Sequence, residues 1–475
     1  MEKIHDYLWE IPKEGDMAVP VRVYANKALI ENMKKDRTLM QARNAARLPS
    51  ITKNMLVMPD GHEGYGSPIG GVAAFDANSG IISPGFVGFD INCGIRVIKT
   101  NLTEKETRPV LGSLMDAMFR NVPSGVGSES KLGFTQKDLD RIATNGVGYI
   151  LEKGYGFADD AERTEEGGCI EGAMTGKVSE LAKQRGIKQL GTLGAGNHFA
   201  EVQKVAEIKD EGIAKAFGLF EGQVVVMLHS GSRGYGHQVC SDYLKVLADY
   251  QKRNGIVMPD PELAYAHVAS KEADDYLGAM RAAVNFAFVN RQIMMHFIRK
   301  SFADTFKKSA DELGMELLYD LSHNIAKLEE HDVDGKRMKL YVHRKGATRA
   351  FGPGRKEITR IYRDYGQPVL IPGSMGTASY VLAGREESMT ETFGSSCHGA
   401  GRVMSRHQAL REIPSSKTFS AMKSKNIEVR VRSRKLVSEE AEWAYKNVDD
   451  VVATIESAKI SKIVARMVPM GVAKG

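Results

Sequence analysis

Long apolar runs, paired cysteines and a signal-type N-terminus are all missing from this chain of 475 residues. A membrane-spanning helix needs about 20 consecutive apolar residues, and the sequence contains no such run. Residues 1–6 lack the charged-then-apolar layout of a signal peptide. The cysteines are scattered without pattern, which argues against a disulfide scaffold and for a reducing compartment; they are Cys93, Cys169, Cys240 and Cys397. The sequence therefore predicts a cytoplasmic protein with no membrane contact.

The common nucleotide-binding signatures are absent as well. Neither a P-loop nor a G-x-G-x-x-G motif that opens a helix is found, so any nucleotide would have to be held by other means. No fixed-period repeat indicates a solenoid. Helix-like and strand-like segments are mixed along the chain. This pattern alone predicts a fold that contains both helices and strands, without specifying their arrangement.

The charge is mildly positive, +6, which permits a polyanionic partner without requiring one. Basic residues concentrate in residues 417–435, where Arg430, Arg432 and Arg434 occupy alternate positions. Such alternation predicts a half-buried strand with the three arginines on one face. That face is either a charged sheet edge that resists aggregation or a track for a nucleic-acid phosphate backbone.

Several short apolar segments are followed by a glycine turn that carries a polar side chain. Residues 224–228 form an apolar run typical of a buried strand, and His229 comes directly after it. Residues 317–321 lead in the same way to the segment with His323. If these turns converge, one carboxylate, one thiolate and three imidazoles would bind borderline transition metals such as Zn or Mn. The donors would be Asp90, Cys93, His198, His229 and His323, with His62 and His398 in reserve.

Residues 397–402 read Cys-His-Gly-Ala-Gly-Arg. Glycines let the backbone approach a ligand closely, and Arg402 and Arg406 are suited to bidentate contacts with phosphate. Together with a pair of metals, these groups indicate phosphoryl or nucleotidyl transfer. His398 is then either a nucleophile or a further metal ligand, and chemistry alone does not separate the two. Further cations predicted to bind phosphate are Arg233, Lys345 and Arg349.

Taken together, the motifs resemble the RtcB family of RNA-splicing ligases, and archaeal members in particular. The resemblance runs from about residue 50 to the C-terminus and keeps the order of every motif. It implies a compact α+β fold in which glycine-rich loops converge on a central metal site, with residues 1–475 forming a single catalytic domain. The matching segments are residues 58–62, 90–94, 194–199, 229–234, 343–347 and 398–402.

The resemblance implies an RNA ligase that depends on GTP and Mn²⁺ and acts in tRNA splicing and RNA repair. One RNA end carries a 2′,3′-cyclic phosphate or a 3′-phosphate, and the other carries a 5′-hydroxyl. His398 is expected to attack the α-phosphate of GTP and form a histidine–GMP phosphoramidate. The GMP then passes to the RNA 3′-phosphate, and the 5′-hydroxyl displaces it.

Site residues follow from the same resemblance. Cys93 is expected to be shared by two Mn²⁺ ions, with Asp90 and His198 completing one site and His229 and His323 the other. Asp60 is predicted to be a catalytic carboxylate near the metals. Phe199 and Tyr445 are predicted to stack on guanine, and Glu201 to accept hydrogen bonds from its amino edge. The full set expected around the guanylate is Asn197, His198, Phe199, Ala200, Glu201, His323, Asn324, Pro372, Gly373, Ser374, Met375, Ser379, His398, Gly399, Ala400, Gly401, Tyr445 and Lys474.

The implied partners are RNA, as tRNA exon halves and broken RNA ends, and an archease activator; a monomer is expected. Ser67 stands where a bulkier, often aromatic residue is expected near the RNA end. Lys474 is the penultimate residue, so it is expected to become ordered only with a ligand.

Two alternatives remain from the residues themselves. A metal-dependent RNA cyclic phosphodiesterase would open RNA ends without joining them, and it would need the metal donors but not the guanylate-binding residues. A non-catalytic RNA-binding scaffold would use residues 417–435, and it would leave the ordered Asp, Cys and His set unexplained.

Overall fold

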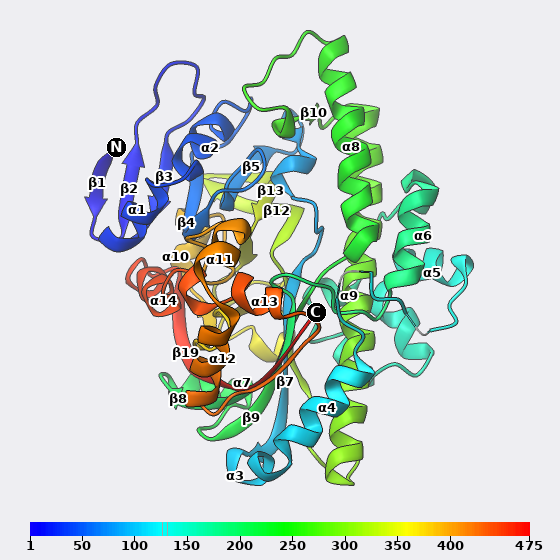
Figure 1. Ribbon diagram of the computed structural model, residues 1–475. Coiled ribbons are helices and arrows are strands. Elements are labelled where there is room, and N and C mark those ends of the chain that lie inside the picture. Colours follow the sequence, from blue (N-terminus) through cyan, green and yellow to red (C-terminus); the bar gives the residue numbers. More distant parts are fainter. Residues whose placement is uncertain (126, 131) are drawn as a thin grey trace.

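The computed structural model describes residues 1–125, 127–130 and 132–475. Within this part of the chain, the strands form two large sheets and two small two-stranded sheets, and helices cover them in a mixed α/β arrangement (Figure 1). None of the helices in the described ranges combines the length and the apolar character needed to cross a membrane.

The first sheet lies toward the N-terminal side of the molecule, and apart from the parallel pair β3–β4 its strands are antiparallel. Its strands, in spatial order, are β1 (Glu2–His5), β2 (Leu8–Ile11), β3 (Val21–Tyr24), β4 (Met55–His62), β5 (Ile69–Asp76), β13 (Lys336–Lys345) and β12 (Asn324–Val333).

The second sheet is antiparallel along its main path and holds the strands that carry most of the predicted site. In spatial order these are β11 (Leu317–Ser322), β7 (Gly94–Thr103), β9 (Gln223–Ser230), β8 (Phe199–Ile208), β19 (Ser461–Lys474), β16 (Ser379–Gly384) and β15 (Pro368–Ile371). β18 (Glu428–Val431) pairs in parallel with β19. The small sheets pair β6 (Ile81–Ile82) with β10 (Ala266–His267), and β14 (Ala347–Arg349) with β17 (Ser395–Cys397).

The helices differ widely in length, and α9 is the longest. It runs beside the second sheet, with α8 next to it and α4 near its lower end in Figure 1. The helices are α1 (Lys27–Met33), α2 (Thr38–Ala45), α3 (Glu104–Thr107), α4 (Leu111–Asn121), α5 (Gln136–Glu152), α6 (Glu180–Gln189), α7 (Glu211–Phe217), α8 (Arg233–Arg253), α9 (Lys271–Phe306), α10 (Glu386–Glu391), α11 (Arg406–Glu412), α12 (Ser415–Ser424), α13 (Arg434–Glu439) and α14 (Val448–Ser457).

The apolar run in β9 is explained by burial of both faces of the second sheet. Val225 and Met227 pack into a core on one side of the sheet. Val224, Val226 and Leu228 pack into a different core on the other side, together with side chains of α4 and α9. Because alternate strand residues point to opposite faces, a strand buried on both faces needs apolar residues at every position. The prediction of a buried strand at residues 224–228 is confirmed.

The register of the second sheet gathers the segments that carry the predicted metal donors. Gly94, at the start of β7, pairs with Ser230 of β9 and with Ser322 of β11. Phe199, at the start of β8, pairs with His229. In antiparallel neighbours, the beginning of one strand lies beside the end of the next. At this end of the sheet, the residues just before β7 and β8 therefore lie beside those at the ends of β9 and β11.

The small β14–β17 sheet delivers His398 to the same region. β14 follows β13 after one residue, and Ala347 pairs with Cys397 at the end of β17. His398 is therefore the first residue beyond a strand that is tied to both the first sheet and the site. Its ring centroid lies 4.9 Å from that of His323.

The interpretation of residues 430–434 as one arginine-bearing strand face is wrong. β18 ends at Val431, and Arg434 is the first residue of α13. Arg430 pairs with Asp116 at 2.6 Å, while the Arg432 guanidinium lies 5.3 Å from the centroid of the Phe119 ring. The period-two pattern breaks because the chain enters a helix at Arg434, while Arg430 and Arg432 contact side chains of α4.

Candidate active site

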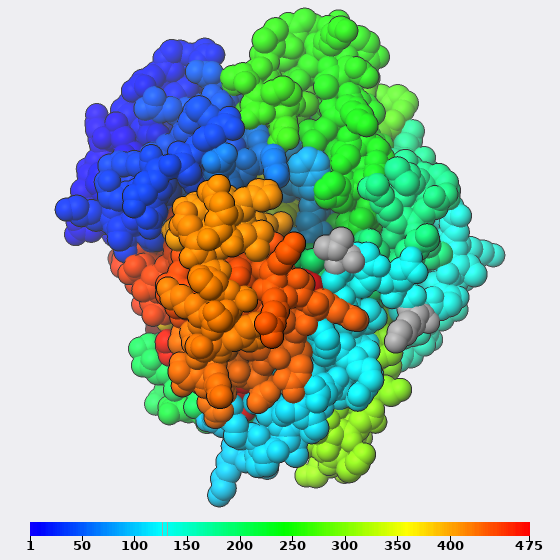
Figure 2. All heavy atoms as spheres, in the orientation of Figure 1, coloured from blue at the N-terminus to red at the C-terminus, as the bar shows by residue number. Residues whose placement is uncertain are grey.

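A cavity of about 1110 Å³ opens where the strand ends of the second sheet meet β14–β17. Figure 2 shows the face of the molecule on which the orange C-terminal segment lies between the blue N-terminal part and the cyan and green parts. Nearly all predicted site residues line the cavity, namely Asp90, Cys93, Asn197, His198, Phe199, Glu201, His229, His323, Asn324, Pro372, Gly373, Ser374, Met375, His398, Gly399, Ala400, Gly401, Tyr445 and Lys474.

Three predicted residues lie behind the cavity wall as the described residues define it: Asp60, Ala200 and Ser379. Ala200 packs into the apolar core on the α9 side of the second sheet. The Ser379 hydroxyl accepts a hydrogen bond from the Gly373 amide at 3.2 Å and one from Gln203. Ser379 therefore supports the loop of Pro372–Met375 from the side that faces away from the cavity.

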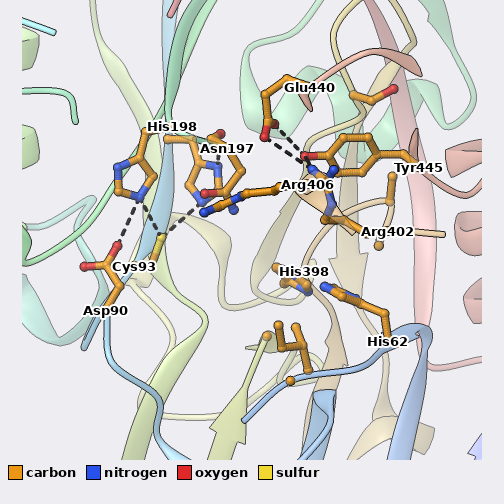
Figure 3. Close-up of a pocket in the computed structure, with 18 of the residues that line it drawn as sticks. His62, Asp90, Cys93, Asn197, His198, His398, Arg402, Arg406, Glu440 and Tyr445 are labelled. Atoms are coloured by element: carbon orange, nitrogen blue, oxygen red, sulfur yellow. Dashed lines mark hydrogen bonds and ion pairs between the residues drawn. The ribbon is translucent and has the colours of Figure 1, made fainter. Parts of the chain in front are cut away.

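The five predicted metal donors form one continuous cluster. Cys93 Sγ lies 3.3 Å from His198 Nε2 and 3.2 Å from His229 Nε2. His198 Nε2 lies 3.0 Å from Asp90 Oδ2, and His229 Nε2 lies 3.4 Å from His323 Nε2. The cysteine sulfur is thus in the centre, with Asp90 and His198 on one side and His229 and His323 on the other. Figure 3 shows Asp90, Cys93 and His198 converging.

Backbone carbonyls fix the tautomers of two of these histidines. His198 Nδ1 lies 3.0 Å from the Leu193 carbonyl oxygen, and His229 Nδ1 lies 3.1 Å from that of Asn197. A carbonyl oxygen only accepts, so each Nδ1 carries the hydrogen and each Nε2 presents a lone pair to the cluster. This is the arrangement that metal-binding histidines adopt.

The chemistry of the donors fits divalent transition ions. Burial raises the pKa of the Cys93 thiol well above its ordinary value, and the nearby Asp90 carboxylate raises it further. Burial also raises the pKa of Asp90, but its bond to His198 and the charge of Arg233 outweigh burial and hold the pKa low. A half-buried carboxylate, a buried thiol and three buried imidazole nitrogens at contact distance are suited to Mn or Zn, and a bound cation favours the thiolate. The donor atoms of Cys93, His198 and His229 all lie within 4.8 Å of one another.

Two neighbouring side chains of α9 hold the loops that carry these donors. Arg291 donates to the carbonyl of Asn92 at 2.7 Å and to that of Ser230 at 2.9 Å. It also pairs with Asp320 of β11 at 2.8 Å. Asn290 accepts from the Gly191 amide and donates to the carbonyls of Thr192 and Gly231.

The segments before β7 and β8 and the ends of β9 and β11 are therefore all tied to one helix. Removing one partner of a buried ion pair typically costs about 3–5 kcal/mol because a charge is left uncompensated. Sequence analysis missed these residues, since a polar pair inside a long, mostly buried helix has no local signal that distinguishes it from an ordinary core contact.

His398 is oriented by Asp60. The Asp60 Oδ2 atom accepts from the backbone amides of His398 at 2.9 Å and Gly399 at 3.1 Å, and it lies 2.5 Å from His398 Nδ1. Burial raises the pKa of Asp60, but the interactions with His398 outweigh burial and lower the pKa overall. The ionised carboxylate keeps the hydrogen on Nδ1, so the lone pair is on Nε2. Asp60 lies behind the histidine that it orients, and its predicted position near the metals stays a prediction.

The close approach of the chain to Asp60 requires a glycine at position 401. Gly401 has φ of +76°, and a Cβ there would lie 2.2 Å from the Asp60 carbonyl oxygen. The chain can therefore turn past Asp60 only without a side chain at this position. The His398 ring lies between the rings of His323 and His62, with centroid separations of 4.9 and 6.4 Å.

The opposite part of the cavity wall carries buried charges that face Tyr445 (Figure 3). Lys474 Nζ bonds to Glu440 at 2.9 Å and to the Gly196 carbonyl at 3.0 Å. Glu440 also accepts from the Tyr445 hydroxyl and pairs with Arg402 at 3.3 Å. Burial raises the pKa of Glu440, but Lys474 and Arg402 lower it to about 2, so the carboxylate is ionised.

The expectation that Lys474 is ordered only with a ligand is wrong. Lys474 belongs to β19, pairs with Phe199 of β8 and Val431 of β18, and is only 3% exposed. Strand pairing on both sides holds the end of the chain in place, which position in the sequence alone did not reveal.

Comparisons with known proteins identify the family. The family model described as RtcB, tRNA-splicing ligase RtcB, matches residues 41–475. The chain is 56% identical to the tRNA-splicing ligase RtcB of Thermococcus kodakarensis over 476 residues, which covers 100% of this chain and 99% of that protein. It is 53% identical to the protein of the same name from Archaeoglobus fulgidus and 48% identical to that from Methanococcus maripaludis, with the same coverage.

The chain belongs to the RtcB family. The resemblance seen in the sequence motifs and the expected mixed α/β fold are confirmed.

In this RtcB-family chain, the cations predicted to bind phosphate are not equivalent. Arg233, Arg402 and Arg406 line the cavity, and Arg406 extends toward the donor cluster (Figure 3). Arg349 is buried and paired with Glu166 at 2.6 Å, so its assignment to phosphate binding is wrong. Its position shortly after Gly346 suggested a side chain free to bind phosphate. In the structure, the carboxylates of Glu165 and Glu166 pair with it.

Lys345 lines the cavity of the RtcB-family site, but its ammonium group is already engaged. It donates to the carbonyls of Tyr65, Ser67 and Gly85. Burial lowers the pKa of Lys345 to about 8. Ser67 itself is buried and donates to the Gly85 carbonyl at 3.3 Å. Lys345 therefore holds the turn at residues 64–68 in place.

Asn324 also supports the RtcB-family site from within the wall. Its amide nitrogen donates to the Asp90 carbonyl at 3.0 Å, and its amide oxygen accepts from the Gly346 amide at 2.9 Å. The residue thus connects the donor cluster to the turn beside His398. Sequence analysis also missed Glu440. This residue follows Glu439 in a segment that contains no recognisable motif.

Proposed function

We propose that this protein is a GTP- and Mn²⁺-dependent RNA ligase that joins 2′,3′-cyclic phosphate or 3′-phosphate RNA ends to 5′-hydroxyl ends. The observation that carries the proposal is the position of His398. It is oriented by Asp60, touches the donor cluster through His323, and is followed by the glycine turn of residues 399–401 on the cavity wall. Membership of the RtcB family, whose relatives are named tRNA-splicing ligases, supports a role in tRNA splicing and RNA repair.

The donor cluster would hold two Mn²⁺ ions, one with Asp90, Cys93 and His198 and one with Cys93, His229 and His323. Bound there, the ions would supply positive charge that neutralises phosphate oxygens during displacement. The carboxylate, thiolate and imidazole donors are all present at contact distance.

His398 is the nucleophile of the first step. Its Nε2 lone pair attacks the α-phosphate of GTP, a P–N bond forms, the bond to the β-phosphate bridging oxygen breaks, and pyrophosphate leaves. Asp60 keeps the Nδ1 proton in place and stabilises the positive charge that develops on the imidazole. Arg406, which lines the cavity, would contact the departing phosphates, whereas the Arg402 guanidinium is already bonded to Glu440 and the Tyr445 hydroxyl.

The RNA then enters the same cavity. An oxygen of its 3′-phosphate attacks the phosphorus of the histidine–GMP group, which restores His398. The 5′-hydroxyl of the other strand attacks the activated 3′-phosphate, GMP leaves, and a phosphodiester joins the strands. A cyclic end must first be opened by water to a 3′-phosphate.

In this proposal the guanylate binds against the wall formed by Pro372–Met375, Gly399–Gly401 and Tyr445. Backbone amides on glycine-rich turns can contact phosphate oxygens. Phe199 and Tyr445 line the cavity, as stacking on guanine requires, and Glu201 lines it as well. Lys474, held by Glu440, supports this wall. The presence of these groups favours a ligase over a cyclic phosphodiesterase, which would need the metal donors alone.

The whole chain acts as one catalytic unit in this proposal, because residues from β4 to β19 line one cavity. The proposal keeps the expected monomer and the expected dependence on an archease activator. Fast multiple-turnover ligation by the isolated protein would contradict the activator requirement.

The ligase proposal is tested with two labelled RNA strands, one ending in a 2′,3′-cyclic phosphate and one beginning with a 5′-hydroxyl. With GTP and Mn²⁺ the strands are expected to be joined, and without GTP only opening of the cyclic end is expected. Gel electrophoresis separates joined from opened products. Opening without joining, with GTP present, would support the phosphodiesterase instead.

Replacing Asp60 by asparagine is expected to slow transfer of GMP to the protein by about 100- to 10,000-fold, because the imidazole loses the carboxylate that sets its tautomer. The rate is measured by intact mass spectrometry over time. Asn retains an oxygen that can accept from the backbone amides, so the glycine turn is expected to keep its shape.

The control for Asp60→Asn is Mn²⁺ affinity, which is expected to stay within threefold of the wild type because Asp60 does not belong to the donor cluster. A transfer rate within tenfold of the wild type would contradict the orienting role. Loss of Mn²⁺ binding would place Asp60 with the metals instead.

A further inference from the structure

Three aromatic rings lie together at the rim of the active-site cavity. Tyr65 follows β4, Phe89 precedes β7, and His237 is on α8, and all three line the cavity. The Tyr65 and Phe89 rings meet edge to face, with centroids 5.9 Å apart at 87°. The Phe89 and His237 rings are 5.0 Å apart and inclined by only 30°. Three segments far apart in the sequence therefore build one aromatic surface.

The outer ring of this surface faces solvent. Tyr65 is 66% exposed, whereas Phe89 is half-buried against the core beneath it. Exposed aromatic rings beside a charged groove are the usual platform for nucleobases, because every base has a π-face. The neighbouring cavity walls carry Arg233 and Arg406, which suit the phosphates of a nucleic-acid strand.

The turn under Tyr65 is rigid. The Lys345 ammonium donates to the Tyr65 carbonyl and, at 3.2 Å, to that of Ser67. Gly66 has φ of +70° and packs so closely that a Cβ would lie 2.9 Å from the Glu262 backbone. The aromatic ring is thus presented from a fixed backbone, which reduces the entropy lost when a ligand stacks on it.

The aromatic surface adjoins the reacting centre. Phe89 directly precedes the metal donor Asp90. His237 is four residues after Arg233 on α8, so the two side chains lie on the same face of that helix. A base on the rings would therefore have its sugar and phosphate beside the donor cluster and Arg233.

We propose that Tyr65, Phe89 and His237 form a stacking platform for the terminal nucleobase of an RNA end at the ligation junction. The proposal rests on the ligase function and names the part of the cavity that receives the RNA. Because stacking is tolerant of base identity, the platform positions an end without selecting its sequence. Either the 5′-hydroxyl strand or the 3′-phosphate strand supplies the base.

The test uses RNA strands with 2-aminopurine as the terminal base, whose fluorescence is quenched on stacking. Tyr65→Ala is expected to weaken binding of the stacked strand by about 5- to 100-fold, the range for loss of one base–aromatic contact. Tyr65→Phe is expected to keep wild-type binding. Tyr365→Ala removes an exposed tyrosine outside the cavity and is expected to bind like the wild type.

Abasic strands identify the base. If the platform holds the terminal base, an abasic residue at that end removes the difference between the wild type and Tyr65→Ala in ligation rate. An effect at the 5′-hydroxyl end assigns the platform to that strand, and an effect at the 3′-phosphate end assigns it to the other. A difference that persists with both abasic strands, or Tyr65→Ala binding within twofold of the wild type, overturns the proposal.

The readouts also separate this proposal from the ligase function. Quenching needs neither GTP nor catalysis, whereas ligation needs both. If the wild type quenches 2-aminopurine through Tyr65 but neither gains GMP nor joins RNA, the platform stands and the ligase function fails. If the wild type ligates but Tyr65→Ala ligates equally well, the platform fails alone.

Discussion

The wild-type protein incubated with GTP and Mn²⁺ is expected to gain the mass of one GMP, and the His398→Ala variant is expected to gain none. His398 is placed as the nucleophile because Asp60 holds its Nδ1 and leaves Nε2 free. A phosphoramidate is acid-labile, so the added mass is expected to disappear after acid treatment. Intact mass spectrometry before and after acid measures both results.

The matched control is His296→Ala. His296 is half-buried beside Tyr155 and Phe297, outside the cavity lining as described. This variant is expected to gain GMP like the wild type, while His398→Ala keeps Mn²⁺ affinity within about tenfold. If His398→Ala lost the metals, His398 would be a ligand and the nucleophile would have to be sought elsewhere. If wild type with filled metal sites gained no mass, nucleotidyl transfer itself would be wrong.

Replacing Cys93 by alanine is expected to lower Mn²⁺ affinity at both sites by at least about 100-fold. Its sulfur touches His198 Nε2 and His229 Nε2 at nearly equal distances, so one substitution removes a donor from each set. Loss of residues that merely support metal ligands already costs about 10- to 100-fold. Titration calorimetry with Mn²⁺ measures the affinity and the number of ions bound, and GMP transfer is expected to be lost in parallel.

Cys240→Ala is the control for this second substitution. Cys240 is likewise buried, but its sulfur contacts the Pro84 carbonyl and it belongs to the apolar core around α5, α8 and α9. The Cys240→Ala variant is expected to bind two Mn²⁺ ions with wild-type affinity. If Cys93→Ala lost only one of two ions, the sulfur would belong to a single site. Unchanged binding of both would remove Cys93 from the ligand set.

Much of this site was predictable because its residues follow strands. A buried strand such as β9 has an apolar run, and the polar residue at its end, His229, can be read directly from the sequence. The same holds for His323 after β11 and for the glycine turn after His398. The structure brings these residues together as expected, although their roles as ligands and nucleophile stay predictions until they are tested.

The remaining features depend on contacts between distant segments. Arg349 and Lys345 look alike in the sequence, yet one is covered by the acidic segment at residues 165–166 and the other holds the Tyr65 turn. The arginine alternation in residues 430–434 was misleading because a turn after Val431 interrupts the strand. The order of Lys474 follows from pairing with β8 and β18, which no local pattern encodes.

The attachment of four donor-bearing segments to Asn290 and Arg291 has a consequence for inherited variation. Both side chains are fully buried in α9 and are absent from the cavity lining in the part of the chain described here. A substitution of Arg291 acts on the segments that carry Cys93, His229 and His323, and a substitution of Asn290 acts on those that carry His198 and His229. Loss-of-function alleles in this gene should therefore cluster on the concealed side of a helix as well as around the cavity, where a survey restricted to ligand-facing residues would overlook them.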